Sequence, residues 1–134
     1  MIRLVAAAAF LLSAAVAPAA QAAEPKYSAS YDRCLAAPSG QSTAGMVGCI
    51  GTELKAQETR LNRAYQDAMK RMTLPRQKTA LQKAQRAWIA FRDADCAAHL
   101  DADWGTIAQV EAASCRLDHT ARRADMLEDF HKPI

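Results

Sequence analysis

The segment from Ala84 to Cys96, AQRAWIAFRDADC, contains most of the residue types that could do chemistry. Catalysis would require a nucleophile beside a base, or two carboxylates facing each other across a cleft. The chain has no GxSxG motif, and a short helical domain rarely forms a cleft between carboxylates such as Asp93 and Asp95. We therefore predict that the protein is not an enzyme.

Four cysteines could form disulfides or bind a metal ion. None belongs to a CxxC pair, and the spacing of His99 and His119 does not complete a zinc site. An even number of cysteines in a small exported chain favours two disulfides. We expect these disulfides, with no metal and no other cofactor, from Cys34, Cys49, Cys96 and Cys115.

The spacing leaves the disulfide pairing open. Cys49 and Cys96 are expected at the same end of a helical hairpin, so they could be joined. Pairing in sequence order, Cys34–Cys49 and Cys96–Cys115, would instead restrain the two segments with the least core of their own. We favour the sequential pairing, in which each loop contributes about 3 kcal/mol by the chain-entropy argument.

The first 22 residues are typical of a secretory signal peptide. Arg3 precedes an apolar run from Leu4 to Val16, and small residues end the segment at Ala22. The run is too short for a membrane span, which needs about 20 apolar residues. We predict cleavage after Ala22 and a soluble, periplasmic or secreted protein without a membrane anchor.

Charge and length restrict the remaining possibilities. The chain has 134 residues and a formal net charge of +3, with basic and acidic residues interspersed. A nucleic-acid-binding protein would usually carry a basic stripe, so we expect no nucleic-acid partner. The length predicts one domain.

Apolar periodicity predicts an all-α domain. Residues 23–40 are interrupted by prolines and a glycine and are expected to form an irregular arm. Ser42 or Thr43 should begin a helix that ends before Pro75, and a second helix should run from about 76 to 99. A third begins near Thr106. We predict a helical domain over 41–130, built as an antiparallel hairpin plus a third helix, three-helix bundle-like and stapled by two disulfides.

The polar residues of the hairpin favour a structural role. Gln85, Trp88, Arg92 and Cys96 share one stripe of the second helix. Arg92 can stack on Trp88 and pair with Asp93 or Asp95. Asn62 should lie near the buried middle of the hairpin and bond across it, since burying an unpaired amide costs about 1–3 kcal/mol. We interpret this set as a network that fixes the helix register, and not as a binding site.

Three sequence patterns resemble the LprI-type lysozyme inhibitor domain, a family of small exported bacterial proteins. They are Leu61-Asn62-x2-Tyr65, the segment AQRAWI with Arg92-Asp93-x2-Cys96, and Cys115-x4-Thr120-x2-Arg123-x3-Leu127. The resemblance extends from about Cys34 to Leu127, and the Gly/Ser-rich interval between Cys34 and Cys49 is longer than is usual in the family. It implies a disulfide-bonded helical domain whose recurring residues form a scaffold, namely Asn62, Tyr65, Gln85, Trp88, Arg92, Asp93, Thr120 and Arg123.

The resemblance also implies inhibition of lysozyme or a related peptidoglycan hydrolase through a protein–protein contact. An envelope adaptor, or an immunity protein against another toxin, is the alternative function. An inhibitor needs an exposed element, and the candidates are the arm around Tyr27 and Tyr31 and the connection formed by His99, Asp101, Asp103 and Trp104. Trp104 could instead cover the end of the core, the arrangement that we favour. The net charge does not help attraction to cationic lysozymes, so electrostatic steering would have to be local.

Overall fold

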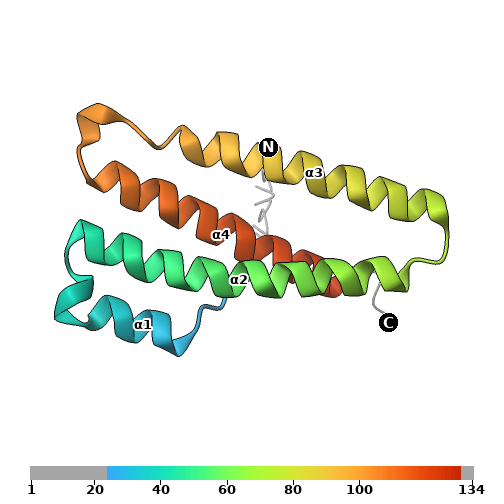
Figure 1. The fold of residues 1–134 in the computed structure, drawn as a ribbon, viewed down its shortest axis with the longest axis horizontal. Helices are drawn as coiled ribbons and strands as arrows, with labels where there is room; N and C mark the ends of the chain where they lie inside the picture. Colours follow the sequence, from blue (N-terminus) through green and yellow to red (C-terminus); the bar gives the residue numbers. More distant parts are fainter. Residues whose placement is uncertain (1–23, 131–134) are drawn as a thin grey trace, which may run out of the picture.

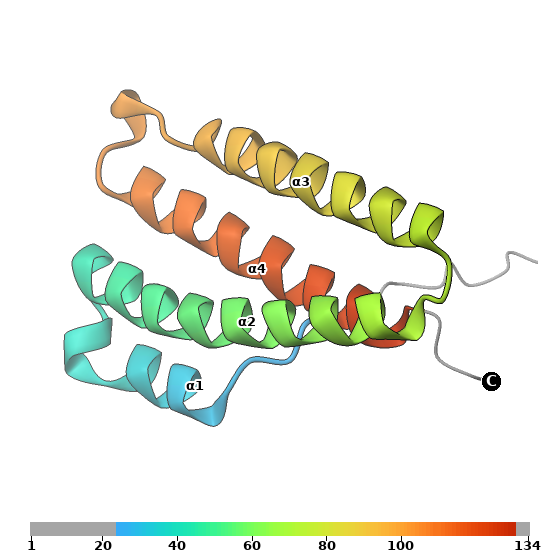
Figure 2. The same ribbon diagram turned by 45° about the vertical axis from the view of Figure 1, so that its right-hand side comes forward.

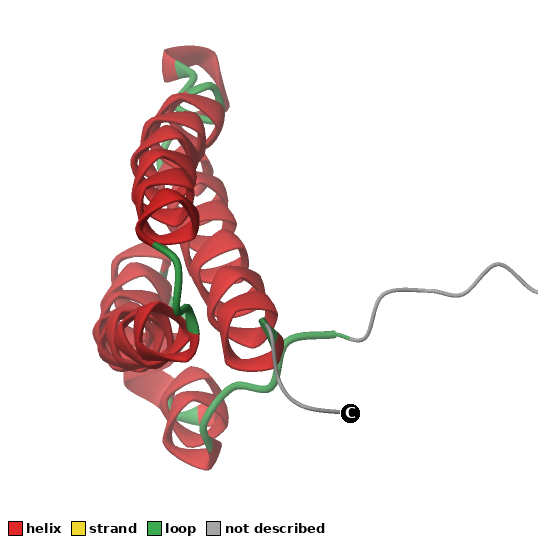
Figure 3. Ribbon diagram, turned by 90° about the vertical axis from the view of Figure 1, so that its right-hand side faces the viewer, coloured by secondary structure: helices red, strands yellow, loops and turns green. Residues whose placement is uncertain are grey.

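A computed structural model describes residues 24–130, and within this range the chain forms helices and loops only (Figure 3). The predicted all-α class is therefore confirmed. The predicted signal peptide, residues 1–22, lies outside the described residues. The helices in chain order are α1 (Ala29–Ala36), the 3-10 turn η1 (Pro38–Gly40), α2 (Thr43–Arg71), α3 (Pro75–Ala97), the 3-10 turn η2 (Ala102–Trp104) and α4 (Ile107–Asp129).

The ends of α2 and α3 follow from capping residues and proline. Ser42 caps α2, because its side-chain oxygen accepts a hydrogen bond from the Gly45 amide at 3.0 Å. Met72 is extended and ends α2. Pro75 occupies the first position of α3, where a missing N–H costs nothing. The predicted break at Leu74-Pro75 lies where the sequence places it.

The arrangement of the long helices differs from a tightly packed hairpin. Figure 1 shows α4 running between α3 and α2, and Figure 2 shows the same order from another side. Both α2 and α3 pack on α4, and the α2–α4 contact is the most extensive of all. Consequently α3 depends mainly on α4 for its packing, although α2 precedes it directly in the chain.

The interior contains two apolar clusters. The larger lies where α2, α3 and the last part of α4 meet, and its buried members are Leu61, Ala64, Ala68, Met72, Leu81, Ala124 and Leu127. The smaller lies near the start of α2 and α4 and contains Ile50, Val110 and Leu117. Many of the buried positions are alanines, so the helices approach closely but each position buries little apolar area.

The prediction that residues 23–40 form an irregular arm is wrong, because most of this segment is helical. The Ser28 side chain accepts from the Tyr31 amide and begins α1. Tyr27 and Tyr31 pack edge to face, with ring centroids 5.4 Å apart, and both contact the smaller cluster. Tertiary packing and the Cys34 disulfide therefore stabilise a helix of eight residues, which is too short to be stable by itself.

The disulfides join neighbours in sequence, as predicted. Cys34–Cys49 links α1 to α2, and Cys96–Cys115 links the end of α3 to α4. The alternative pair Cys49–Cys96 does not occur. Both bonds lie toward the end of the molecule that has the smaller apolar cluster, where a covalent restraint has most to add.

None of the helices in residues 24–130 combines the length and the apolar character that a membrane crossing requires.

Candidate functional site

The stripe of α3 that contains Gln85, Trp88, Arg92 and Cys96 contacts α4. Trp88 is half-buried against the larger apolar cluster. The guanidinium carbon of Arg92 lies 5.1 Å from the centroid of the Trp88 ring, and that of Arg123, on α4, lies 5.8 Å from it. Two cations over one indole ring hold its position through cation–π attraction.

Hydrogen bonds extend this contact from α3 to α4. Arg92 Nη1 donates to Thr120 Oγ1 at 3.2 Å, and Arg92 Nη2 lies 2.9 Å from Asp93 Oδ1. Arg123 Nε donates to Gln85 Oε1 at 3.0 Å. Six of the eight residues assigned to the structural network are thus brought together between α3 and α4.

Asn62 and Tyr65 do not belong to this network. The prediction that Asn62 is buried and bonded across the hairpin is wrong, because α2 and α3 diverge and Asn62 is exposed. Tyr65 packs on the edge of the larger cluster. Neither side chain forms a hydrogen bond with another residue of the described part of the chain.

Arg123 is a partly buried cation of the network. Burial lowers the pKa of its guanidinium, and its Nη2 has no hydrogen-bond partner within residues 24–130. The Trp88 ring and the Gln85 oxygen provide its polar surroundings. A cation held in this way favours one register of α4 against α3.

A groove runs between α2 and α3 and is about 540 Å³ in volume. It is the consequence of the two helices packing on α4 rather than on each other. Asn62 and Tyr65 form part of one wall, and Gln85, Trp88 and Arg92 form part of the other. These five residues, which we interpreted from the sequence as an interior scaffold, therefore line an open surface groove.

The connection between α3 and α4, residues 98–106, forms one end of the molecule and is called the tip below. The Asp101 side chain accepts from the Asp103 amide at 2.8 Å and begins η2. Gly105 follows with φ of 64° and ψ of −149°, a backbone conformation that is accessible almost only to glycine. Thr43 Oγ1 donates to Thr106 Oγ1 at 3.2 Å, which ties the tip to the start of α2.

Large apolar side chains are exposed at the tip. Trp104 is 55% exposed and Leu100 is 56% exposed. The interpretation that Trp104 covers the end of the core is therefore wrong. His99 is half-buried, whereas Asp101 and Asp103 are exposed beside Trp104.

His119 has a partner that sequence spacing did not reveal. Its Nε2 lies 2.9 Å from Asp95 Oδ2, and its ring packs edge to face on Phe91 with centroids 5.4 Å apart. The Cys96–Cys115 disulfide lies beside this pair, and the four side chains bring their ligand atoms within 4.8 Å of one another. Because both sulfurs are joined to each other, they cannot act as thiolate ligands.

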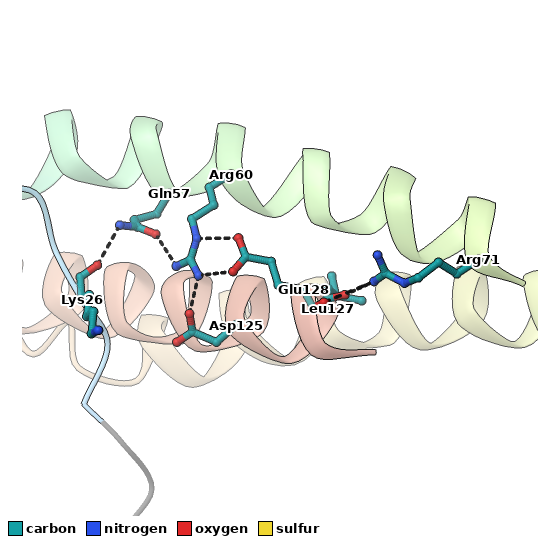
Figure 4. Close-up of polar contacts among 7 residues, drawn as sticks. All are labelled: Lys26, Gln57, Arg60, Arg71, Asp125, Leu127 and Glu128. Atoms are coloured by element: carbon teal, nitrogen blue, oxygen red, sulfur yellow. Dashed lines mark hydrogen bonds and ion pairs between the residues drawn. The ribbon is translucent and has the colours of Figure 1, made fainter. Parts of the chain in front are cut away.

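A polar cluster around Arg60 joins α2 to α4 (Figure 4). Arg60 Nε and Nη2 donate to the two carboxylate oxygens of Glu128 at 2.8 and 2.6 Å, and Nη2 also contacts Asp125. These hydrogen bonds with Glu128 and Asp125 raise the pKa of Arg60. No sequence pattern predicted this clamp, although Asp125 and Glu128 are three apart on one helical face.

Buried Glu53 connects α2 to the segment that precedes α1. It accepts from the Ser28 amide at 3.1 Å, from the Ser28 hydroxyl at 2.5 Å and from Gln57 Nε2 at 2.9 Å. Burial by itself would raise the pKa of Glu53, but these hydrogen bonds outweigh it and lower the pKa. No sequence pattern distinguished Glu53 from the other acidic residues of the chain.

A comparison with known protein families gives a match. A model of the family described as "Lysozyme inhibitor LprI" matches residues 34–127. No curated protein and no solved structure matches the chain. The matched range begins at the first cysteine and includes every residue of the α3–α4 network.

Proposed function

The chain belongs to the LprI family of lysozyme inhibitors, and on that premise we propose that it is an exported protein that binds and inhibits a lysozyme or a related peptidoglycan hydrolase. The family match is the observation that carries this proposal. Export agrees with the N-terminal sequence and with two disulfides, which persist in oxidising compartments.

The tip is the surface that we assign to the hydrolase. Trp104 and Leu100 expose more than half of their surface there, and exposed aromatic side chains are typical anchors of protein–protein contacts. The tip is also restrained, by the Asp101 cap, the Thr43–Thr106 hydrogen bond and the nearby Cys96–Cys115 disulfide. A restrained loop loses little conformational entropy on binding.

The charge of the tip supports a cationic partner. From Asp93 to Glu111 the sequence carries five acidic residues and neither lysine nor arginine. The end that contains the tip is therefore acidic, although the whole chain has a net positive charge. Such an end would attract a cationic lysozyme and accelerate association at low salt.

Inhibition of cell-wall lysis tests the function directly. The mature protein, at ratios near one to one, should slow lysis by at least one lysozyme of the chicken, goose or invertebrate type. Absence of inhibition of all three would contradict the proposal. Capture of a different partner from the periplasm would then favour the alternative adaptor or immunity function.

Substitution of two exposed apolar residues, one in the tip and one outside it, tests whether the tip contacts the hydrolase. Trp104→Ala should weaken inhibition by about 30-fold or more, the loss of a typical anchor of about 2 kcal/mol. Met126→Ala, which removes a 60% exposed side chain near the other end of α4, is the matched control and should inhibit as the wild type does. Equal inhibition by both variants would exclude the tip as the contact.

A further inference from the structure

The groove between α2 and α3 is a second candidate binding site, distinct from the tip. Its volume of about 540 Å³ lies in the range of small-molecule sites, roughly 300–1,000 Å³. It is open because both of its walls are supported by α4 and leave space between them. Asn62 and Tyr65 lie on one wall of this groove and Gln85, Trp88 and Arg92 lie on the other, and inhibition through the tip does not require them.

The walls carry side-chain amides with unused hydrogen-bonding capacity. Asn62 and Gln66 lie on α2, and Gln82 lies on α3. All three are exposed, and none forms a hydrogen bond with another residue in the described range 24–130. Each amide offers two donor hydrogens and an acceptor oxygen, so the groove can exchange several hydrogen bonds with a ligand rich in hydroxyl and acetamido groups.

Aromatic rings lie among these amides. Trp88 and Tyr65 both line the groove, one from each wall. Trp88 is held by Arg92 and Arg123 and does not need to reorganise when a ligand arrives. Rings that combine an apolar face with a polar edge suit the apolar faces of pyranose sugars.

The charge of the groove favours an anionic ligand. Arg86 lines the groove, is exposed and forms no ion pair with another described residue. Residues 75–92, most of α3, carry five basic residues and no acidic one. Glu58 is the acidic residue of the groove, and it lies 3.9 Å from Arg92. An unpaired guanidinium at the rim can bind a carboxylate in a bidentate manner.

A sugar fits this groove better than a peptide does. Peptides are usually recognised by addition of a strand to a sheet edge or by an apolar groove that takes the apolar face of a helix. The walls here are helices, whose backbone groups are bonded internally, and their lining is half polar. Amides, aromatic rings and a guanidinium together match acetamido, hydroxyl and carboxylate groups on a saccharide.

We propose that the α2–α3 groove binds an oligosaccharide of N-acetylated amino sugars that carries carboxylate groups, the chemistry of the bacterial cell-wall glycan. The site goes beyond the proposed inhibition, because the tip would bind the hydrolase and the groove would bind that enzyme's substrate. Such a protein would be retained on the wall at the place where the hydrolase acts.

Tryptophan fluorescence and side-chain amide NMR signals provide the test. The chain contains two tryptophans, Trp88 and Trp104, so a Trp104→Phe protein reports on the groove alone. The probes are chitotetraose, which is neutral, a disaccharide–tetrapeptide from the cell wall, which is anionic, and the free tetrapeptide. We expect both saccharides to bind, the anionic one more tightly, and the tetrapeptide alone not to bind.

Surface substitutions then assign the contacts. Asn62→Ala and Gln82→Ala should each weaken saccharide binding about threefold to tenfold, as expected for one or two lost hydrogen bonds. Arg86→Gln should remove the preference for the anionic saccharide and leave chitotetraose binding unchanged. Gln109→Ala, an exposed amide on α4 outside the groove, is the control and should bind as the wild type does.

The outcomes are separable from those of the inhibition assay. Lack of any spectral change with either saccharide at several millimolar, or equal binding of the tetrapeptide and the saccharide–peptide, would overturn the glycan site. Saccharide binding without hydrolase inhibition would leave this site in place and reject the proposed function.

Discussion

Glu53 illustrates how a single buried charge can couple two segments of this chain. Its carboxylate is almost inaccessible to solvent, and its three hydrogen bonds come from Ser28 and Gln57. Ser28 is also the cap of α1. The charge of Glu53 therefore stabilises the start of α1 as well as its own position on α2.

Glu53→Gln should make the protein less stable at neutral pH and less sensitive to acid. The folded state holds the pKa of Glu53 below its ordinary value of 4.5. Its contribution is therefore complete above that pH and is lost as the pH falls through the folded-state pKa. At pH 7 we expect a loss of about 1–3 kcal/mol in the free energy of unfolding.

Urea unfolding of the wild type and Glu53→Gln between pH 7 and pH 3 measures this effect. The two curves of stability against pH should converge below about pH 4.5, the window set by the unfolded-state pKa. A constant separation across the whole range would show that the charge of Glu53 is not the stabilising feature. Glu111→Gln, an exposed carboxylate on α4, is a suitable control.

Residue types predicted some contacts and not others. The pairing of Arg92 with Trp88 and with Asp93 follows from spacing within one helix, and the structure has both contacts. The choice of Thr120, Gln85 and Arg123 as partners depends on which helix faces α3, which no local pattern specifies. Asn62 was misplaced for the same reason, since its burial was deduced from an assumed α2–α3 contact.

The bounds of the elements were easier to predict than their packing. Ser42, Pro75 and Thr106 each lie within one residue of a helix start, because caps and prolines act locally. The short helix α1 was missed because a helix of eight residues is marginal by itself and is stabilised by contacts with the rest of the chain. Long-range packing, and not propensity, accounts for that difference.

Replacement of Gly105, the glycine of the tip, should strain the backbone. With φ of 64°, any L side chain is strained there, although an added Cβ would meet no atom within 4 Å. Gly105→Ala should cost about 1–3 kcal/mol in unfolding free energy, all of it from the backbone. Thermal or urea unfolding measures the loss of unfolding free energy. Inhibition of lysozyme should weaken in parallel if the tip changes shape.

Gly48 on α2 provides the opposite case. It lies inside a helix and, like Gly105, has free space around the position of a Cβ. Gly48→Ala should stabilise the protein by up to about 1 kcal/mol, because alanine favours the helix and restricts the unfolded chain. Destabilisation by both substitutions to a similar extent would argue against backbone strain as the cause at Gly105.

The whole molecule combines two ends that are stabilised differently. The end where α2 turns into α3 contains the larger apolar cluster and no disulfide among the described residues. The other end contains the smaller cluster, both disulfides and the tip. A domain of this size has little apolar core to spare, so covalent restraints compensate where the core is thin.

Reduction of the disulfides should therefore loosen one end before the other. In a dithiol reductant at neutral pH, we expect amide hydrogen exchange to accelerate first in α1, the start of α2 and the tip, because each lost bond removes about 3 kcal/mol of restraint. Amides around Leu61, Ala68 and Leu127, which lie in the larger cluster, should remain protected longest. A Cys34→Ala/Cys49→Ala protein should show the effect at α1 and the start of α2 but not at the tip, which separates the two bonds. Simultaneous loss of protection along all four helices would mean that the two ends unfold as one cooperative unit, and that the disulfides stabilise the domain globally.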